Sequence, residues 1–204
     1  MVDQNIEDLP PHDRRRFFST GLSRLLRPLA DYIEEKLPVE LPLTTAAQLR
    51  PPGAIEERQF LATCYRCGSC ADACPVNAIH ITQGAGEELD GTPYIDPSVQ
   101  ACVICDALAC MKACPSTALK QGKKYGIRIG LAIVDHSLCV RSRGVDCLKC
   151  IEPCPLGDTA IRLNENGRVH VISPTRGGRG CIGCGVCQRQ CPTTPTKAIR
   201  VMPT

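Results

Sequence analysis

The segment CYRCGSCADACP, residues 64–75, decides the interpretation of this chain. Its cysteines follow the spacing C-x2-C-x2-C-x3-C, and a proline comes directly after the last of them. The same spacing returns in CIGCGVCQRQCP (181–192). Two modified copies lie between these: CVICDALACMKACP (102–115) has two added residues, and CVRSRGVDCLKCIEPCP (139–155) has five, placed after its first cysteine. We name these segments groups one to four in chain order.

The chain of 204 residues is therefore a repeat with a period of about 40 residues. Apolar segments flank the groups, and AIRLNENGRVHVI (160–172) alternates apolar and polar residues on both sides of a turn, as a β-hairpin does. We predict a hairpin in each connection between groups. The expected fold class is α+β: two fused units with short β-hairpins, small helices and cysteine-rich loops.

The cysteine spacing suits the corners of an iron–sulfur cube. Two-residue gaps allow a looping backbone to present three thiolates to one cube, and the fourth cysteine, before proline, ligates the other cluster of a pair. Zinc sites use two separated C-x2-C pairs, and disulfide frameworks do not repeat in groups of four, so both are disfavoured. We expect four [4Fe–4S] clusters, with a three-iron cluster or a lost site in groups two and three as the alternative. The predicted ligands are Cys64, Cys67, Cys70, Cys74, Cys102, Cys105, Cys110, Cys114, Cys139, Cys147, Cys150, Cys154, Cys181, Cys184, Cys187 and Cys191.

Group three differs from the others in that seven residues, and not two, separate its first cysteine, Cys139, from its second, Cys147. Cys139 stands where the first cysteine of every other group stands, so we predict that the longer loop returns it to the same cluster. The loop carries Arg141 and Arg143, whose charge would favour the reduced cluster. We predict a higher reduction potential there than in groups one and four, and a partner contact at this loop.

Groups one and four match the motif of bacterial two-cluster ferredoxins residue for residue, and group two resembles the second motif of four-cluster subunits that accompany molybdenum oxidoreductases. The groups either pair consecutively, one with two and three with four, or nest, one with four and two with three. The resemblance to four-cluster subunits implies nesting, which we favour. The ligand set is the same in both arrangements.

Composition limits the other functions. Aromatic residues make up 3% of the chain and Trp is absent, so bound clusters would have to complete the core. With a net charge of +3, no basic patch with interleaved aromatics and no apolar run of about 18 residues, neither nucleic-acid binding nor a membrane span is expected. His80 and His170 are expected to face outward on strands, and TRGGRG (175–180) to form a turn. No catalytic constellation stands at the right spacing, so we expect an electron carrier and not an enzyme.

Residues 1–53 form a predicted N-terminal arm without cysteine, followed by a four-cluster domain at 54–204. Residues 13–37 have the apolar spacing of an amphipathic helix, basic in its first half and acidic in its second. DRRRFFS (13–19) resembles the twin-arginine export motif, but Arg24, Arg27 and Asp31 interrupt the apolar stretch that an export signal needs. We therefore expect a cytoplasmic protein that keeps this helix. The helix would dock on a partner or on an anionic membrane surface. The alternative is a periplasmic protein exported by the twin-arginine route.

The twin-arginine-like start, together with four cysteine groups in about 200 residues, resembles the NapG/MauM ferredoxin-type family. That resemblance implies service in periplasmic nitrate reduction or methylamine oxidation, with electrons passing from a membrane or quinol-linked donor to a redox enzyme. The donor and acceptor would be redox proteins that the sequence does not name. The alternatives are an iron–sulfur subunit or a maturation or sensing factor of an oxidoreductase complex, and an enzyme with an open iron site.

Overall fold

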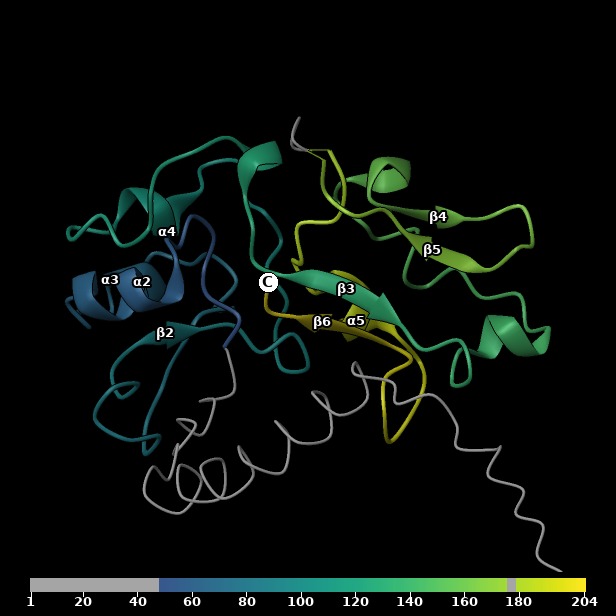
Figure 1. Ribbon diagram of the computed structural model, residues 1–204, viewed down its shortest axis with the longest axis horizontal. Helices are drawn as coiled ribbons and strands as arrows, with labels where there is room; N and C mark the ends of the chain where they lie inside the picture. The colour runs from purple at the N-terminus through teal and green to yellow at the C-terminus, as the bar shows by residue number, and fades with distance from the viewer. Residues whose placement is uncertain (1–47, 176–178) are drawn as a thin grey trace, which may run out of the picture. The chain divides into compact units, whose positions relative to one another are not determined.

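The structure is a computed structural model that describes residues 48–175 and 179–204 (Figure 1). The predicted helix at 13–37 and the twin-arginine-like motif lie outside these residues. The described chain consists of short elements joined by longer loops. In order, they are α2 (Glu57–Thr63), α3 (Ser69–Asp72), β1 (His80–Ile81), β2 (Pro93–Tyr94), α4 (Ala109–Lys112), the 3-10 turn η1 (Lys124–Gly126), β3 (Leu131–Val134), η2 (Val140–Arg143), η3 (Gly157–Thr159), β4 (Ile161–Leu163), β5 (Val169–Val171), α5 (Val186–Gln190) and β6 (Ile199–Met202). This mixture of small helices and short strands confirms the α+β class.

Two of the three predicted hairpins are present as antiparallel pairs. β1 pairs with β2, with His80 opposite Tyr94, and β4 pairs with β5, with Ile161 opposite Val171. In the second hairpin Ile161 and Val169 are buried while Arg162 and His170 are exposed, as the alternating sequence predicts.

The hairpin predicted between groups two and three is wrong. β3 pairs with β6, the segment after group four, with Leu131 opposite Met202. The segment after group two instead forms a bridge between Leu119 and Ala54, ahead of group one. The segment before group one thus bonds to the segment after group two, and the segment before group three bonds to the segment after group four.

The compact unit that holds the cysteines runs Ala47–Thr204 and includes the last residues assigned to the predicted arm. Arg50 is only 5% exposed and donates to Glu57 of α2 at 2.6 Å, to Thr92 Oγ1 at 3.0 Å and to the carbonyl of Pro93 at 2.8 Å. Its guanidinium also lies 4.8 Å from the ring centroid of Phe60. These contacts join residues 48–53 to the cysteine-rich unit, so they do not belong to the arm.

The core is aliphatic and rich in sulfur. Phe60 is 0% exposed and is the only buried aromatic residue in the described ranges. Cys70, Cys110, Cys184 and Cys187 belong to the same buried cluster as the isoleucines and valines. Within the described part of the chain, no helix is long and apolar enough to cross a membrane.

Candidate metal centres

Four cavities of similar size are each lined by four cysteines. In the order of the groups that supply most of their sulfur, the space free of protein atoms at these cavities, open solvent included, is about 320, 370, 360 and 370 Å³. We name each cavity after the group that contributes three cysteines. The group-one pocket contains Cys64, Cys67, Cys70 and Cys114; the group-two pocket Cys102, Cys105, Cys110 and Cys74; the group-three pocket Cys139, Cys147, Cys150 and Cys191; and the group-four pocket Cys181, Cys184, Cys187 and Cys154. All sixteen cysteines are accounted for, and all are free thiols.

These sets show that the groups pair consecutively, so the nested pairing favoured from the sequence is wrong. The fourth cysteine of each group, the one before proline, lines the pocket of its neighbour in sequence: Cys74 and Cys114 exchange between groups one and two, and Cys154 and Cys191 between groups three and four. The short helix that carries the third cysteine of a group explains the exchange. In group one, α3 carries Cys70 near its start, and Cys74 follows its end at Asp72. The two thiols are thereby presented to different cavities.

The seven-residue gap in group three does not remove Cys139 from its pocket. The added residues form η2, Val140–Arg143, which closes at Gly144 in the left-handed conformation (φ +89°). Arg141 donates to the carbonyl of Gly167 at 2.8 Å and forms an ion pair with Asp146, while Arg143 donates to the carbonyl of Leu138 at 3.2 Å. The insertion is thus held in place by its own arginines, and Cys139 faces the same cavity as Cys147 and Cys150.

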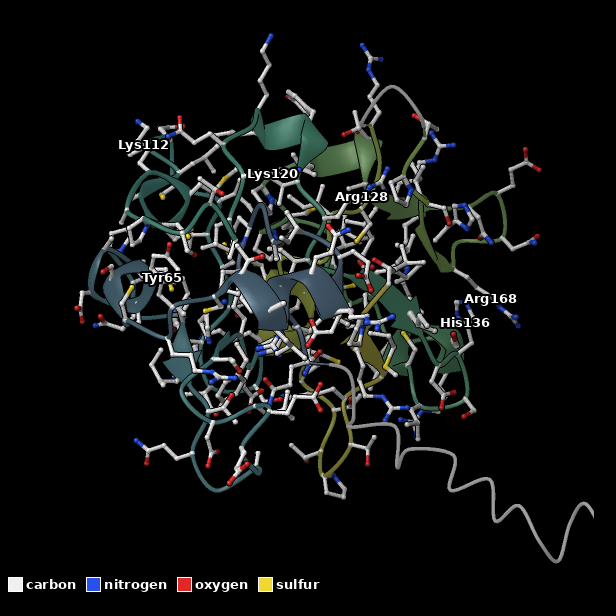
Figure 2. The ribbon with its side chains drawn as sticks, turned by 60° about the vertical axis from the view of Figure 1, so that its left-hand side comes forward. Tyr65, Lys112, Lys120, Arg128, His136 and Arg168 are labelled. Carbon is white, nitrogen blue, oxygen red and sulfur yellow. The ribbon has the colours of Figure 1, made fainter. Side chains whose placement is uncertain are left out.

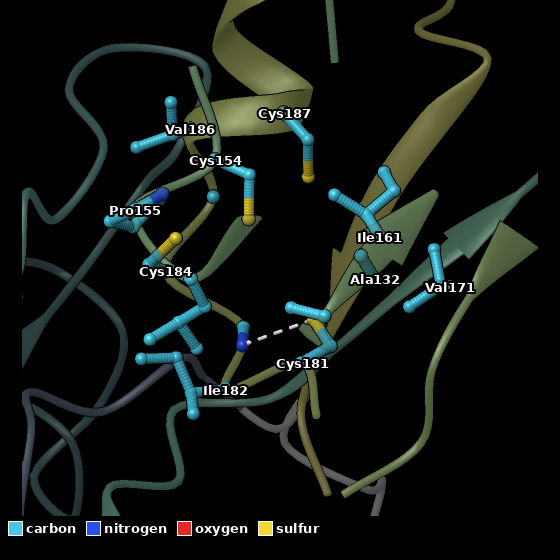
Figure 3. Close-up of a pocket in the computed structure, with 14 residues that line it drawn as sticks. Ala132, Cys154, Pro155, Ile161, Val171, Cys181, Ile182, Cys184, Val186 and Cys187 are labelled. Atoms are coloured by element: carbon cyan, nitrogen blue, oxygen red, sulfur yellow. Dashed lines mark hydrogen bonds between the residues drawn. The ribbon is translucent and has the colours of Figure 1, made fainter. Parts of the chain in front are cut away.

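Backbone N–H groups point at several of the sulfur atoms. Distances from nitrogen to sulfur are 3.4 Å for Arg66 to Cys64, 3.3 Å for Ala78 to Cys74, 3.5 Å for Leu119 to Cys114 and 3.4 Å for Gly183 to Cys181. The last of these is visible in Figure 3, where the thiols of Cys154, Cys181, Cys184 and Cys187 surround one cavity. Such donors stabilise negative charge on a ligating sulfur and tune the potential of a cluster.

Hydroxyl groups add to this at three positions that the sequence reasoning did not single out. One of them is Ser116, which lies 3.6 Å from the sulfur of Cys114. Ser69 lies 3.3 Å from the sulfur of Cys67, and its hydrogen bonds lower the pKa of that thiol. Thr193 lies 3.2 Å from the sulfur of Cys191. Burial acts to raise the pKa of Cys191, but hydrogen bonds from Thr193 and from the backbone outweigh it, and the pKa is lowered. In each case the hydroxyl residue follows its cysteine by two positions, and this spacing in the sequence could have predicted the contact.

Without a positive centre, the buried thiols resist ionisation. Burial raises the pKa of Cys102 and of Cys184 to about 12, and that of Cys70 and of Cys110 to about 11, with the neighbouring thiols adding to the effect. Four thiolates in one cavity are stable only when metal cations lie among them. Iron ions bound to the sulfur atoms would supply that positive charge. Four cysteines around a cavity, backbone donors to sulfur and apolar walls all fit a [4Fe–4S] cluster.

A single metal ion fits this geometry less well. Across residues 48–175 and 179–204, no group of three or more His, Cys, Asp or Glu side chains converges closely enough to hold one ion. The four cysteines of each set are instead spread around the walls of a cavity. A structural zinc ion needs four thiolates at about 2.3 Å from one point.

The other residues considered from the sequence lie outside these pockets. His170 is exposed as predicted, whereas the outward orientation predicted for His80 is wrong. His80 is half-buried, its ring lies 5.6 Å from that of Tyr94, and its Nε2 is buried without a hydrogen-bond partner in the described structure. Part of the segment 175–180, residues 176–178, is outside the described residues.

Sixteen thiols gathered in fours on small helices and two-stranded sheets define an iron–sulfur protein of the ferredoxin type. Comparison with known proteins agrees: the model of the 4Fe-4S dicluster domain matches residues 63–118. The chain is 38% identical over 182 residues to the methylamine utilization ferredoxin-type protein MauM of Methylorubrum extorquens, which covers 86% of this chain and 79% of that protein. It is 33% identical over 202 residues to the ferredoxin-type protein NapG of Escherichia coli, which covers 95% of this chain and 87% of the relative. The chain belongs to the NapG/MauM family of ferredoxin-type proteins, which confirms the family expected from the resemblance of its start and its cysteine groups.

Proposed function

We propose that this protein carries single electrons through four [4Fe–4S] clusters between a redox donor and a redox acceptor. The observation that carries the proposal is the division of sixteen cysteines into four pockets of four, with none left over. The clusters would supply the one-electron chemistry themselves, with potentials set by their surroundings. Each pocket would hold one cluster through the four cysteines that line it.

The polypeptide would hold these clusters in two fused two-cluster units. The match of a dicluster domain to residues 63–118, which contain groups one and two, supports the first unit. The pairing of β3 with β6 around groups three and four supports the second, since it repeats the bridge between Ala54 and Leu119 around groups one and two. In both units the apolar walls and the N–H donors would keep water from the clusters and stabilise charge on sulfur.

The partners are proposed from the relatives. Some of these are named as ferredoxin-type proteins of methylamine utilization, which indicates electron exchange with another redox protein. We propose a membrane or quinol-linked donor and a redox enzyme as acceptor. An iron–sulfur subunit, or a maturation or sensing factor, of an oxidoreductase complex is the alternative role.

The number and behaviour of the clusters test this function. Purification without oxygen should give about sixteen irons and sixteen sulfides per chain, since each of the four pockets would hold a four-iron cube. A redox titration followed by EPR should show four clusters that are reduced and reoxidised reversibly. About eight irons, or a cluster that loses iron on each redox cycle, would contradict the relay and favour the maturation or sensing role.

The arm requires a separate experiment. We propose that residues 13–37 remain attached and dock on a partner or an anionic membrane surface in the cytoplasm. Mass spectrometry of the protein purified from its own cells should then show an intact N-terminus in the cytoplasmic or membrane-associated fraction. A shortened chain in the periplasm would establish twin-arginine export instead.

A further inference from the structure

The two pairs of pockets meet at one point of the structure. The backbone N–H of Cys102, which lines the group-two pocket, donates to the carbonyl of Cys184, which lines the group-four pocket, at 3.0 Å. Groups two and four are thus neighbours, although group three lies between them in the sequence.

Several contacts hold this junction in place. Gln188 of α5 is 8% exposed; its Nε2 donates to Ser98 Oγ at 3.0 Å, and its Oε1 accepts from the backbone of Val201 at 2.7 Å. Arg189 donates to the carbonyl of Val99. The segment that leads into group two therefore lies along the helix that follows the first cysteines of group four.

Gly183, next to Cys184 in the group-four loop, faces the segment that leads into β3, and its backbone conformation does not explain why it is glycine. Its φ is +73°, but the residues at the same position of groups one and two, Arg66 and Ile104, have φ of +53° and +50°. A side chain is therefore tolerated in this conformation. What differs is the space, because a Cβ on Gly183 would lie 2.4 Å from the backbone of Gly130.

Gly185 shows the same contrast. It precedes α5 with φ of +86°, as Gly68 precedes α3 with φ of +77° and Leu108 precedes α4 with φ of +45°. A Cβ on Gly185 would lie 2.5 Å from the Cβ of Pro97, whereas a Cβ on Gly68 would meet nothing within 4 Å. At Gly185 a side chain is excluded by the segment before group two and not by the helix that it begins.

The two remaining pockets lie at the ends. The exchange of Cys74 and Cys114 joins the group-one pocket to the group-two pocket, and that of Cys154 and Cys191 joins the group-three pocket to the group-four pocket. Tyr65, which lines the group-one pocket, and His136, which lies 3.3 Å from Ser142 in the group-three insertion, are on opposite sides of the view in Figure 2.

We infer that electrons move in the order group one, group two, group four, group three, and that Gly185 is a positioning residue that keeps the two middle clusters close. This rests on the proposed function, because it assumes a cluster in each pocket. Distance controls the rate of electron tunnelling steeply, so a side chain that separates the group-two and group-four loops slows transfer between the halves. The path differs from the order of the groups along the chain.

The substitution Gly185→Ala tests the junction, and Gly68→Ala is its matched control. Both place a methyl group on a residue of positive φ before a short helix, but only the first meets a neighbour. With iron content unchanged, Gly185→Ala should weaken the magnetic interaction between the reduced group-two and group-four clusters in EPR, and Gly68→Ala should not. Adding Pro97→Gly to Gly185→Ala removes the clashing side chain and should restore the interaction. Equal spectra for all three variants would overturn the role of Gly185.

The order itself is tested without touching the glycines. Cys181→Ala/Cys187→Ala removes two thiols from the group-four pocket, and Cys139→Ala/Cys147→Ala removes two from the group-three pocket. The first pair should change the EPR signal of the reduced group-two cluster, and the second should leave it as it is. An equal effect of both pairs, or an effect of the second alone, would overturn the order. An iron content of the unsubstituted protein well below sixteen would instead reject the proposed function.

Discussion

Consecutive pairing makes a quantitative prediction about cluster loss. Cys64 and Cys114 line the same pocket, whereas Cys64 and Cys191 line different ones. The double substitution Cys64→Ala/Cys114→Ala therefore removes two thiolates from one site and leaves the other three sites complete. We expect the loss of about four of sixteen irons, one quarter of the total, because a cube with two ligands missing is not retained.

The comparison variant Cys64→Ala/Cys191→Ala removes one thiolate from each of two pockets. We expect two perturbed clusters and a loss of up to about eight irons, half of the total. Nested pairing would reverse the two results, since Cys64 and Cys191 would then share a cluster. The assay is iron and sulfide analysis of protein purified without oxygen, with EPR to count the unperturbed clusters. Two perturbed clusters in Cys64→Ala/Cys114→Ala, with one in the comparison variant, would refute the reasoning from the pockets.

Three further predictions follow from individual residues. Cys139→Ala should remove the group-three cluster from the EPR spectrum, and four unchanged clusters would show that Cys139 is not a ligand. Arg143→Gln should lower the potential of the group-three cluster more than Arg141→Gln, because Asp146 offsets the charge of Arg141; the measurement is a redox titration, and an unchanged potential in the double variant would contradict any role of these charges. Arg50→Ala should destabilise the fold by about 2–3 kcal/mol, mainly because the buried carbonyl of Pro93 loses its donor, whereas Glu57, with a side chain 39% exposed, can be hydrated. The measurement is denaturant unfolding followed by cluster absorbance, in which Arg50→Ala should lower the midpoint. The exposed control Arg58→Ala should change the free energy of unfolding by less than about 0.5 kcal/mol. Equal midpoints for the two variants would contradict the prediction.

The hairpin of β4 and β5 was predicted correctly and the hairpin of β3 was not. The difference lies in how far apart in the sequence the paired strands are. Ile161 and Val171 are ten residues apart around a tight turn, in which Gly167 adopts a φ of +68° and Asn164 Oδ1 accepts from two backbone N–H groups. Local sequence contains all of that information. The pairing of Leu131 with Met202 spans about 70 residues and depends on how two cysteine loops pack between them. Periodicity marks such a strand but does not name its partner.

The amino-acid sequence by itself determined the chemistry of this protein. The spacing of the cysteines and the proline after each fourth one are local features, and they were enough to predict four sulfur-lined sites and the return of Cys139 to its group. These inferences depend only on how far a few residues of backbone can reach.

Tertiary structure alone decided which groups share thiols and which pockets are neighbours. Four equivalent groups can be combined in more than one way with the same ligand set, so their spacing cannot choose between the arrangements. The choice depends on contacts between residues far apart in the chain, such as the bridge from Ala54 to Leu119 and the hydrogen bond from Cys102 to Cys184. It also depends on Gly185, whose missing side chain matters only because Pro97, from the segment before group two, lies against it.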